Sequence, residues 1–281
     1  MTCETEPVYG ARWMMSGPNP ITDTECKRMV EAGCTGVLLM LHHEGHRKRD
    51  GSILIGGALR RDDEIVVSLA RARAYGLDIG VIVWWDGTPG HAESAARLVW
   101  ALHERVGLDC IMHDFERIGM RQRRRHYDDA LAVHDQLWTM PPTNGLRLPP
   151  LQVLAAYASP GPRSIALAAC RTVDAVMHMG YGNARHSPST LRALLPWLRR
   201  WLRAWRRHLR PNQALWHGQG AYDLHRPDAS SESVLLAMAE TAAEEGCETI
   251  AYWQLETMDT GSQEDRMLRG AMAQVAAWRR E

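Results

Sequence analysis

Two acids stand two residues apart in the segment LDCIMHDFER, where a short apolar run ends. The run has the composition of a buried β-strand, and successive side chains of a strand alternate between its two faces. Met112, Asp114 and Glu116 are therefore expected to share one face. His113 and Phe115 are expected on the other. The spacing predicts two carboxyl groups about 7 Å apart on one side of a strand.

Such a pair could carry acid–base chemistry. Two neighbouring carboxyl groups raise each other's proton affinity, so one of them can stay protonated near neutral pH. A protonated carboxyl group in a site is what general acid catalysis requires. We therefore expect Glu116 to be the proton donor and Asp114 to be its electrostatic partner. The alternative is that Glu116 forms a surface ion pair with Arg117 or Arg121.

Other aromatic and polar side chains gather where further apolar runs end. Tryptophan and tyrosine faces pack against the C–H faces of sugar rings, while carboxylates and amides bind hydroxyl groups. A phosphate site would instead need glycine-rich turns and basic residues at helix starts. The sequence therefore predicts a carbohydrate site, although each tryptophan taken alone could also pack in a core. The predicted substrate-binding residues are Tyr181, Met179, Trp253, Asp86, Trp85, Tyr157, Trp216 and Gln254.

These residues must be positioned by the strands that they terminate. Apolar runs predict strands at 8–16, 36–43, 78–86, 108–116, 151–159, 174–182, 214–222 and 249–256. Helical spacing predicts helices at 22–32, 62–75, 91–106, 119–138, 163–171, 188–209, 230–245 and 263–280. This strict alternation predicts an α/β fold, a single (β/α)8 TIM barrel over residues 1–281. The rival, a doubly wound open sheet, lacks its glycine-rich fingerprint after the first strand.

Helix boundaries have their own signals. Thr22 with Glu25, Ser187 before Pro188, and Ser230 or Ser231 are expected to begin helices. Four glycines are expected to end helices just before the next strand, because glycine adopts the left-handed conformation at no steric cost. They are Gly33, Gly76, Gly107 and Gly246.

Charge gives no reason to expect a polyanionic partner. Basic and acidic residues balance at 33 each, so neither nucleic acid nor an anionic membrane is expected to bind. Arginine runs at 121–126 and 198–210 are the exceptions. Trp197, Trp201 and Trp205 stand four apart within or beside the second run, which predicts an amphipathic outer helix whose arginine stems cover an apolar stripe.

The cysteines, the first residues and the distribution of apolar stretches bear on the cellular location. The six cysteines are scattered without CxxC spacing and are expected to be buried free thiols. The first residues lack the pattern of a secretion signal, and no stretch is long and apolar enough to span a bilayer. A cytoplasmic location is expected, with release by lysis or as a phage product as the alternative. The residues imply no cofactor and no particular oligomeric state.

The strand around Asp114 resembles the DxxDxDxE motif on strand four of glycoside hydrolase family 18, the chitinase-like TIM barrels. Asp109, Asp114 and Glu116 match acids of that motif, while Met112 stands at the position of another. The resemblance implies that Glu116 is the catalytic acid and base. It also implies that Asp114 orients the acetamido group of the substrate, which attacks in place of an enzyme nucleophile.

Two later segments resemble the same family. HMGY is similar to its strand-six Met-x-Tyr, which gives Met179 and Tyr181, and IAYWQLE is similar to its strand-eight segment, which gives Trp253. By this resemblance Tyr181 binds the acetamido group and Trp253 floors the sugar pocket. The implied activity is hydrolysis of a glycosidic bond in an oligo- or polysaccharide that contains amino sugars. Gly182 replaces the aspartate that usually follows the tyrosine, which with Met112 leaves room for another sugar or for lost activity.

Alternatives of other classes stay open. Barrels of the family 25 lysozyme type also carry an acid-x-acid pair, and Asp86 or Glu256 could supply the second carboxylate of another hydrolase mechanism. A metal-dependent hydrolase would use strand-end histidines, but no HxH or HExxH pattern supports a ligand set, and no metal is predicted. Those histidines are His42, His43, His46, His91, His113, His178 and His217. The third alternative is a carbohydrate-binding barrel without catalysis.

Overall fold

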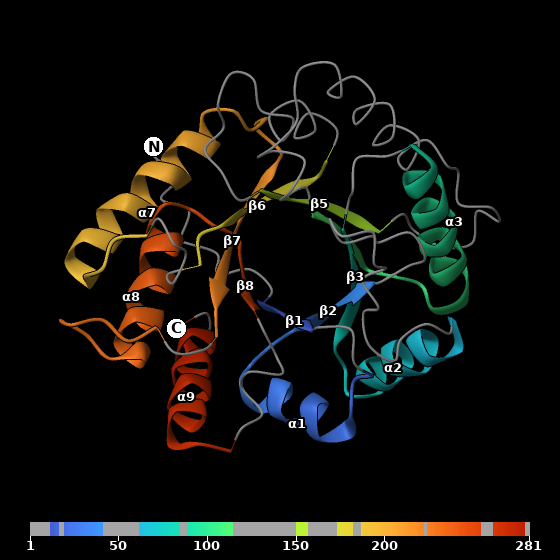
Figure 1. Cartoon of the computed structure of the whole chain (residues 1–281), viewed down its shortest axis with the longest axis horizontal. Helices are drawn as coiled ribbons and strands as arrows, with labels where there is room; N and C mark the ends of the chain where they lie inside the picture. Colours follow the sequence, from blue (N-terminus) through green and yellow to red (C-terminus); the bar gives the residue numbers. More distant parts are fainter. Residues whose placement is uncertain are drawn as a thin grey trace, which may run out of the picture.

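A closed barrel of eight parallel strands, in chain order, forms the centre of the molecule (Figure 1). The computed structural model describes residues 12–16, 20–41, 62–84, 89–114, 150–156, 173–181, 187–221, 224–253 and 261–278. The strands are β1 (Arg12–Ser16), β2 (Gly36–Leu41), β3 (Asp78–Trp84), β4 (Cys110–Asp114), β5 (Leu151–Ala156), β6 (Ala175–Met179), β7 (Ala214–Gly220) and β8 (Thr249–Trp253). Pairing of β8 with β1 closes the ring, and the predicted TIM barrel is confirmed.

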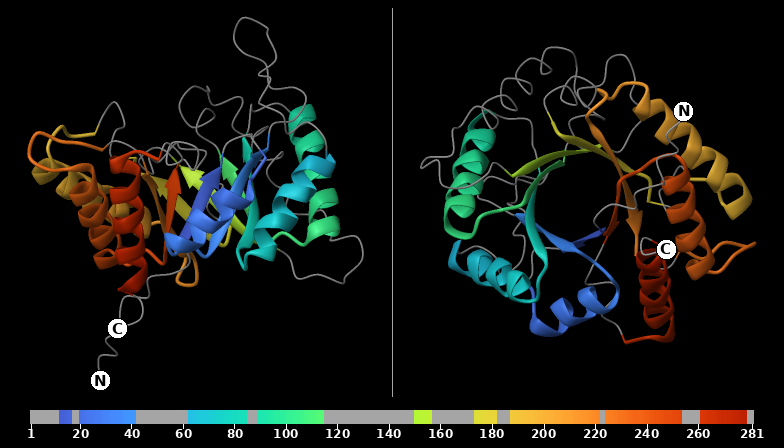
Figure 2. Two further views of the ribbon diagram at one scale, coloured as in Figure 1. Left: turned by 90° about the horizontal axis from the view of Figure 1, so that it is seen from below. Right: turned by 180° about the vertical axis from the view of Figure 1, so that it is seen from behind.

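Helices surround the strands (Figures 1 and 2). The described helices are α1 (Asp23–Glu31), α2 (Asp62–Ala74), α3 (Pro89–Val106), α7 (Leu191–Arg206), α8 (Ser231–Glu244) and α9 (Gln263–Ala277). The predicted helices at 119–138 and 163–171 lie outside the described residues. None of the described helices is both long and apolar enough to cross a membrane.

Local capping explains where α1 and α8 begin. The Thr22 hydroxyl accepts the Glu25 N–H at 3.2 Å, and the Glu25 carboxylate accepts the Thr22 N–H at 2.6 Å, which makes the predicted capping box. The Ser230 hydroxyl accepts the Ser233 N–H at 3.2 Å and caps α8. These two predicted starts are confirmed.

The predicted start of α7 at Ser187 is wrong, because this helix begins at Leu191 with Thr190 as its cap. The Thr190 hydroxyl accepts the Ala193 N–H at 3.3 Å. The Asp228 carboxylate also accepts the Leu191 N–H at 2.8 Å. An acid 37 residues away in sequence thus supplies part of the cap, which local pattern cannot reveal.

Glycine ends four of the described helices as expected. Gly33, Gly76, Gly107 and Gly246 have φ values of 73°, 77°, 67° and 77°, which lie in the left-handed region. Only glycine enters that region without strain, so each helix can turn directly into the next strand.

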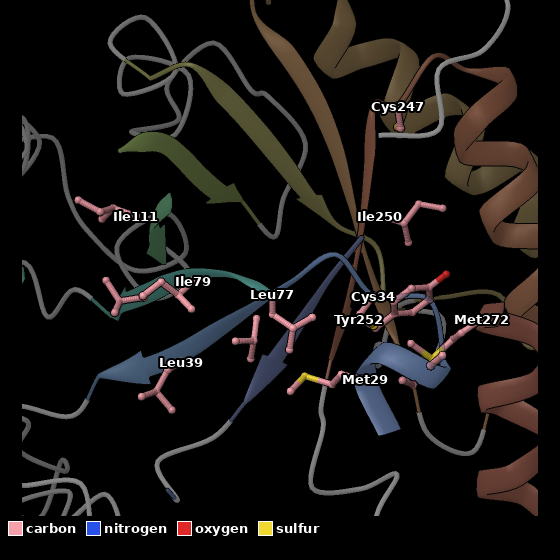
Figure 3. Packing of buried hydrophobic residues seen from close by; sticks show 14 of the residues in the cluster. Met29, Cys34, Leu39, Leu77, Ile79, Ile111, Cys247, Ile250, Tyr252 and Met272 are labelled. Carbon is pink, nitrogen blue, oxygen red and sulfur yellow. The ribbon is translucent and has the colours of Figure 1, made fainter. Parts of the chain in front are cut away.

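Alternation along the strands divides the apolar core into two layers. The outer layer lies between strands and helices, and Figure 3 shows Met29 of α1, Tyr252 of β8 and Met272 of α9 within it. The inner layer fills the barrel interior, and we call it the bore cluster. Its buried members are Leu38, Ile82, Cys110, Met112, Val153, Ala155, Ala175, Met177, Met179, Trp216 and Ala251.

Acids at strand starts fasten the lower end of the barrel. Asp109 precedes β4, and its carboxylate accepts the Ile79 N–H at 2.9 Å and a hydrogen bond from Arg73 at 2.5 Å. Asp174 precedes β6, and its carboxylate accepts the Gln152 N–H at 2.9 Å. In both cases a side chain continues the ladder where the strand backbone has ended. Asp109 therefore has a structural role at the end of the barrel opposite Asp114.

The helix α7 is amphipathic, as predicted. Leucines four residues apart and Trp205 face inward and are fully buried, while Trp197 and Trp201 are only partly buried. The buried leucines are Leu194, Leu198 and Leu202. Arg206 reaches across to the end of α8, where its guanidinium donates hydrogen bonds to the carbonyl oxygens of Glu245 and Gly246. These carbonyls have no partner within their own helix, so the contact joins the two helices.

The cysteines within the described residues are free and buried, as predicted. They are Cys26, Cys34, Cys110 and Cys247. Burial, with the nearby Asp23 carboxylate, raises the pKa of the Cys26 thiol to about 11. This thiol is therefore protonated and unreactive at neutral pH.

Glycine at position 80 is required by close packing in the bore. A Cβ atom there would lie 2.6 Å from Leu38 Cδ2 and 2.7 Å from the Cys110 carbonyl oxygen. We expect Gly80→Ala to lower the free energy of unfolding by about 1–3 kcal/mol, because a backbone carbonyl cannot move aside. Urea unfolding measures this change.

The matched control is Gly270→Ala on the exposed side of α9. A Cβ atom at Gly270 meets nothing within 4 Å. Alanine should there stabilise the helix by up to about 1 kcal/mol, because it loses less backbone entropy than glycine on folding. Equal effects of the two substitutions would contradict the packing explanation for Gly80.

Candidate active site

The described part of β4 ends at Asp114, at the upper end of the barrel. Its side chain is 8% exposed, on the same strand face as Cys110 and Met112 of the bore cluster. His113 points the other way, and its Nε2 lies 3.2 Å from Gln152 Oε1 in the outer layer. The predicted alternation is thus confirmed as far as Asp114. Glu116 lies outside the described residues, and its role stays a prediction.

The strand register identifies the neighbours of Asp114. Trp84 on β3 and Ala155 on β5 pair with it, and Met177 on β6 pairs with Ala155. Because Ala155 carries only a methyl group, the next large side chain beyond it in this row is Met177. The carboxyl group therefore stands above a bore of methionine and alanine. Its desolvation in such surroundings favours the protonated form or a hydrogen-bonded partner.

Several other predicted site residues lie on the same bore side. Met179 belongs to the bore cluster, and Tyr181 and Trp253 are partly buried and pack against that cluster. Trp216 is only 3% exposed, so it packs inside the bore and offers little surface to a ligand. Among the described aromatic residues, Tyr181 and Trp253 are the best placed to contact a ligand at the upper end of the barrel, where the strands end. We call this end the mouth. The predicted residues Asp86, Trp85, Tyr157 and Gln254 lie outside the described residues.

Glycines on β7 contribute to the mouth, and sequence reasoning did not include them. Gly218 pairs with Met179 on one side and with Ala251 on the other, and Gly220 pairs with Trp253. A Cβ at Gly218 would lie 3.2 Å from the Met177 side chain, so the position is tightly packed. The signal was available in the segment WHGQG, because glycines two apart in a strand mark a close approach on one face.

Two of the strand-end histidines do not lie at the mouth, where the metal hypothesis needs them. His178 and His217 lie in the outer layer with ring centroids 6.2 Å apart and planes 17° apart. The His178 ring also lies 6.3 Å from Trp197 of α7. Gln219, two residues after His217 on β7, donates a hydrogen bond to the Leu235 carbonyl oxygen at 2.9 Å on the helix side. All three side chains alternate along their strands with residues that face the bore.

Burial keeps these histidines neutral. It lowers the pKa of His178 to about 3, and the neighbouring His217 lowers it further. Burial also lowers the pKa of His217 and of His113 to about 4, against smaller opposing effects of hydrogen bonds. A metal site would need such rings to converge on one point at the mouth. Within the described ranges, no three His, Cys, Asp or Glu side chains are grouped to hold a metal.

Four further histidines belong to the metal hypothesis. His42, His43 and His46 lie outside the described residues, as does the side chain of His91. The motif acid Asp109 lies before the start of β4 and is not part of the mouth. Asp114 is five steps along the strand from Asp109, which corresponds to about 17 Å.

Comparisons with solved structures show which barrels this fold is similar to. The C-terminal domain of a putative chitinase from Desulfitobacterium hafniense superposes with a TM-score of 0.66 at 11% identity, covering 96% of this chain and 99% of that chain. A family 18 chitinase from Cycas revoluta in complex with (GlcNAc)3 gives 0.65 at 8% identity, covering 95% and 99%. The Bacillus cereus spore cortex-lytic enzyme SleL gives 0.59 at 14% identity, covering 92% and 73%.

At this level of identity the likeness establishes the fold. The chain has the barrel fold of family 18 glycoside hydrolases, as the sequence resemblance implied. No protein-family model matches the sequence, and no curated protein sequence matches it significantly.

Because these histidines are buried and neutral, we expect the free energy of unfolding to depend on pH. Unfolded histidine has a pKa of about 6.5. Between that pH and about 4 the unfolded chain binds protons that the folded chain excludes. The contribution of these neutral histidines to the free energy of unfolding is therefore fully present above pH 6.5, and it is lost as the pH is lowered. Replacing His178 with Leu should reduce the slope of unfolding free energy against pH by up to about 1.4 kcal/mol per pH unit.

Denaturant unfolding between pH 7 and pH 5 measures that slope. The control is His208→Leu, which removes an exposed histidine at the end of α7. The variants are compared by this slope and not by their stability at one pH, because the His178 substitution also removes ring packing. An unchanged slope in the His178 variant would show that this ring takes up protons in the folded state.

Proposed function

We propose that this chain is a glycoside hydrolase that cleaves a polysaccharide containing amino sugars by general acid–base catalysis. The observation that carries the proposal is the position of Asp114, a nearly buried acid on the bore side of β4 beside the mouth. Support comes from the family 18 barrel fold and from Tyr181 and Trp253 on the same side of the barrel. The Cycas revoluta chitinase with this fold was crystallised with (GlcNAc)3, which suggests the class of ligand.

In the proposed reaction, Glu116 gives its proton to the glycosidic oxygen while the bond to the anomeric carbon breaks. The carbonyl oxygen of the substrate's acetamido group attacks that carbon, and Asp114 orients this group and stabilises its developing positive charge. Glu116 then takes a proton from the water that opens the intermediate. No metal or cofactor takes part in this proposal.

A second function, carbohydrate binding without catalysis, is favoured by Met112. This side chain is 1% exposed in the bore, two residues before Asp114, where family 18 has an acid. Asp114 thus has an apolar neighbour below it where that family has a carboxyl group to share a proton. Catalysis by this chain then depends on Glu116 and Asp114 alone among the acids of the motif.

Substitution of the two acids tests the proposal. Glu116→Gln should lower kcat by a factor of about 10²–10⁴, since it removes the proton donor and keeps the shape of the side chain. Asp114→Asn should also lower kcat, because the neutral amide stabilises positive charge less well. Binding of the uncleaved glycan should change little in either variant. The assay follows release of reducing ends from chitin, peptidoglycan and galactosaminoglycan fragments, with binding measured by calorimetry.

Asp109→Ala is the matched control for an acid of the same motif. It should lower the free energy of unfolding by about 1–3 kcal/mol, because the Ile79 N–H loses its acceptor. Its kcat should equal that of the wild type at a temperature where both are folded. Full turnover by Glu116→Gln would overturn the assignment. Tight glycan binding by a wild-type protein that cleaves none of these substrates would instead establish the non-catalytic function.

A further inference from the structure

The outer side of α7 carries a concentration of positive charge. Seven arginines and no acid occur between residues 191 and 210. Part of this surface is hollowed into a groove with a volume of about 410 Å³, which we call the arginine groove. Its lining residues are Pro196, Arg199, Arg200, Arg203, Ala204 and Arg207. The charge balance of the whole chain therefore conceals a local basic surface.

Two of these arginines are held in place by acids of the neighbouring helix end. Arg203 donates two hydrogen bonds to the Glu245 carboxylate, at 2.8 and 2.6 Å, and Arg199 pairs with Glu244. The Arg203 contact is the two-pronged geometry in which a guanidinium matches a carboxylate. A carboxylate of a ligand can meet a guanidinium in the same geometry.

The other two arginines project without an acid partner among the described residues. Arg200 lies over the Trp201 ring with its central carbon 5.0 Å from the ring centroid, and Arg207 is exposed. They are seven residues apart, so they stand on the same helix face about 10 Å from each other. The pair offers two guanidinium groups to anions spaced along an extended ligand.

The position of α7 connects this groove with the mouth. Because β6 runs into α7, the helix begins at the mouth end of the barrel and descends along its outside. Packing of His178 against Trp197 joins α7 to β6, the strand that carries Met179. Arg200 is nine residues beyond Leu191, which places it about 14 Å below the start of the helix. A chain that leaves the mouth over β6 would reach it after a short distance.

We propose that the arginine groove binds an acidic polysaccharide through carboxylate groups on its sugars. The guanidinium fork of Arg200 and Arg207 suits planar carboxylates, and Trp201 supplies an aromatic face beside them. Glu244 and Glu245 flank the groove and disfavour a continuous phosphate backbone, so a nucleic acid is the weaker candidate. The choice of a glycan rests on the proposed function, whereas the preference for anions rests on the groove itself.

Binding of defined oligosaccharides to the full chain tests this site. The probes are oligogalacturonate, in which every sugar carries a carboxylate, and chitohexaose, which is neutral. Wild type should bind oligogalacturonate at low salt, and the affinity should fall as salt is raised. Arg200→Ala with Arg207→Ala should weaken that binding by at least about ten-fold, because two charge-assisted pairs are lost. Chitohexaose binding should be the same in both proteins.

The control removes the same charge elsewhere. Lys27→Ala with Arg266→Ala should change oligogalacturonate binding by less than about two-fold, since these exposed side chains lie on α1 and α9. A second groove variant, Arg200→Gln with Arg207→Gln, keeps polar stems of similar shape and should lose binding to the same extent. Thermal melting verifies that each variant is folded.

Three results would overturn the proposal. They are no oligogalacturonate binding at low salt, equal weakening by the groove and control variants, and tighter binding of a DNA duplex that the groove variants abolish. A wild-type protein that binds oligogalacturonate but neither binds nor cleaves chitohexaose would count against the proposed function alone. The two proposals therefore fail separately.

Discussion

Closure of eight parallel strands into a ring is the constraint on which the rest of the molecule depends. Each strand residue then faces either the bore or the layer beneath the helices, and adjacent residues face opposite ways. Asp114 and His113 are neighbours in sequence, yet one stands at the mouth and the other is buried beside Gln152. Met179 and His178 are separated in the same way. The chemistry available at each position thus follows from which side of the sheet it occupies.

The ring also places different polar groups at its two ends. At strand starts, the carboxylates of Asp109 and Asp174 accept hydrogen bonds from backbone N–H groups and so hold neighbouring strands together. At the end of a strand, Asp114 stands above a bore of methionine, alanine and tryptophan. An acid in those surroundings is costly for folding unless its proton or its partner is controlled. The two ends of the barrel thus hold their acids in different surroundings.

The spacing of apolar residues and the glycines at helix ends made much of the fold predictable. Apolar runs identified the strands, and Gly33 and Gly246 marked helix ends because few other residues tolerate their backbone angles. The start of α7 was predicted at the wrong residue, although Thr190 caps it locally; only the second part of the cap, from Asp228, lies beyond local pattern. At the mouth, strand alternation correctly placed Asp114 on the bore side. The same alternation places the rings of His178 and His217 in the outer layer, away from the point where the metal hypothesis needs them.

The contact between Arg206 and the end of α8 links two positions that are 40 residues apart in sequence. A Cβ atom at Gly246 would lie 2.6 Å from the Arg206 guanidinium, so any larger residue there must displace the arginine. Loss of the arginine would in turn relieve the steric reason for glycine and leave only its backbone angle. Across an evolving lineage, these two sites should therefore change together more often than chance allows. Natural variation at one would then report on the other.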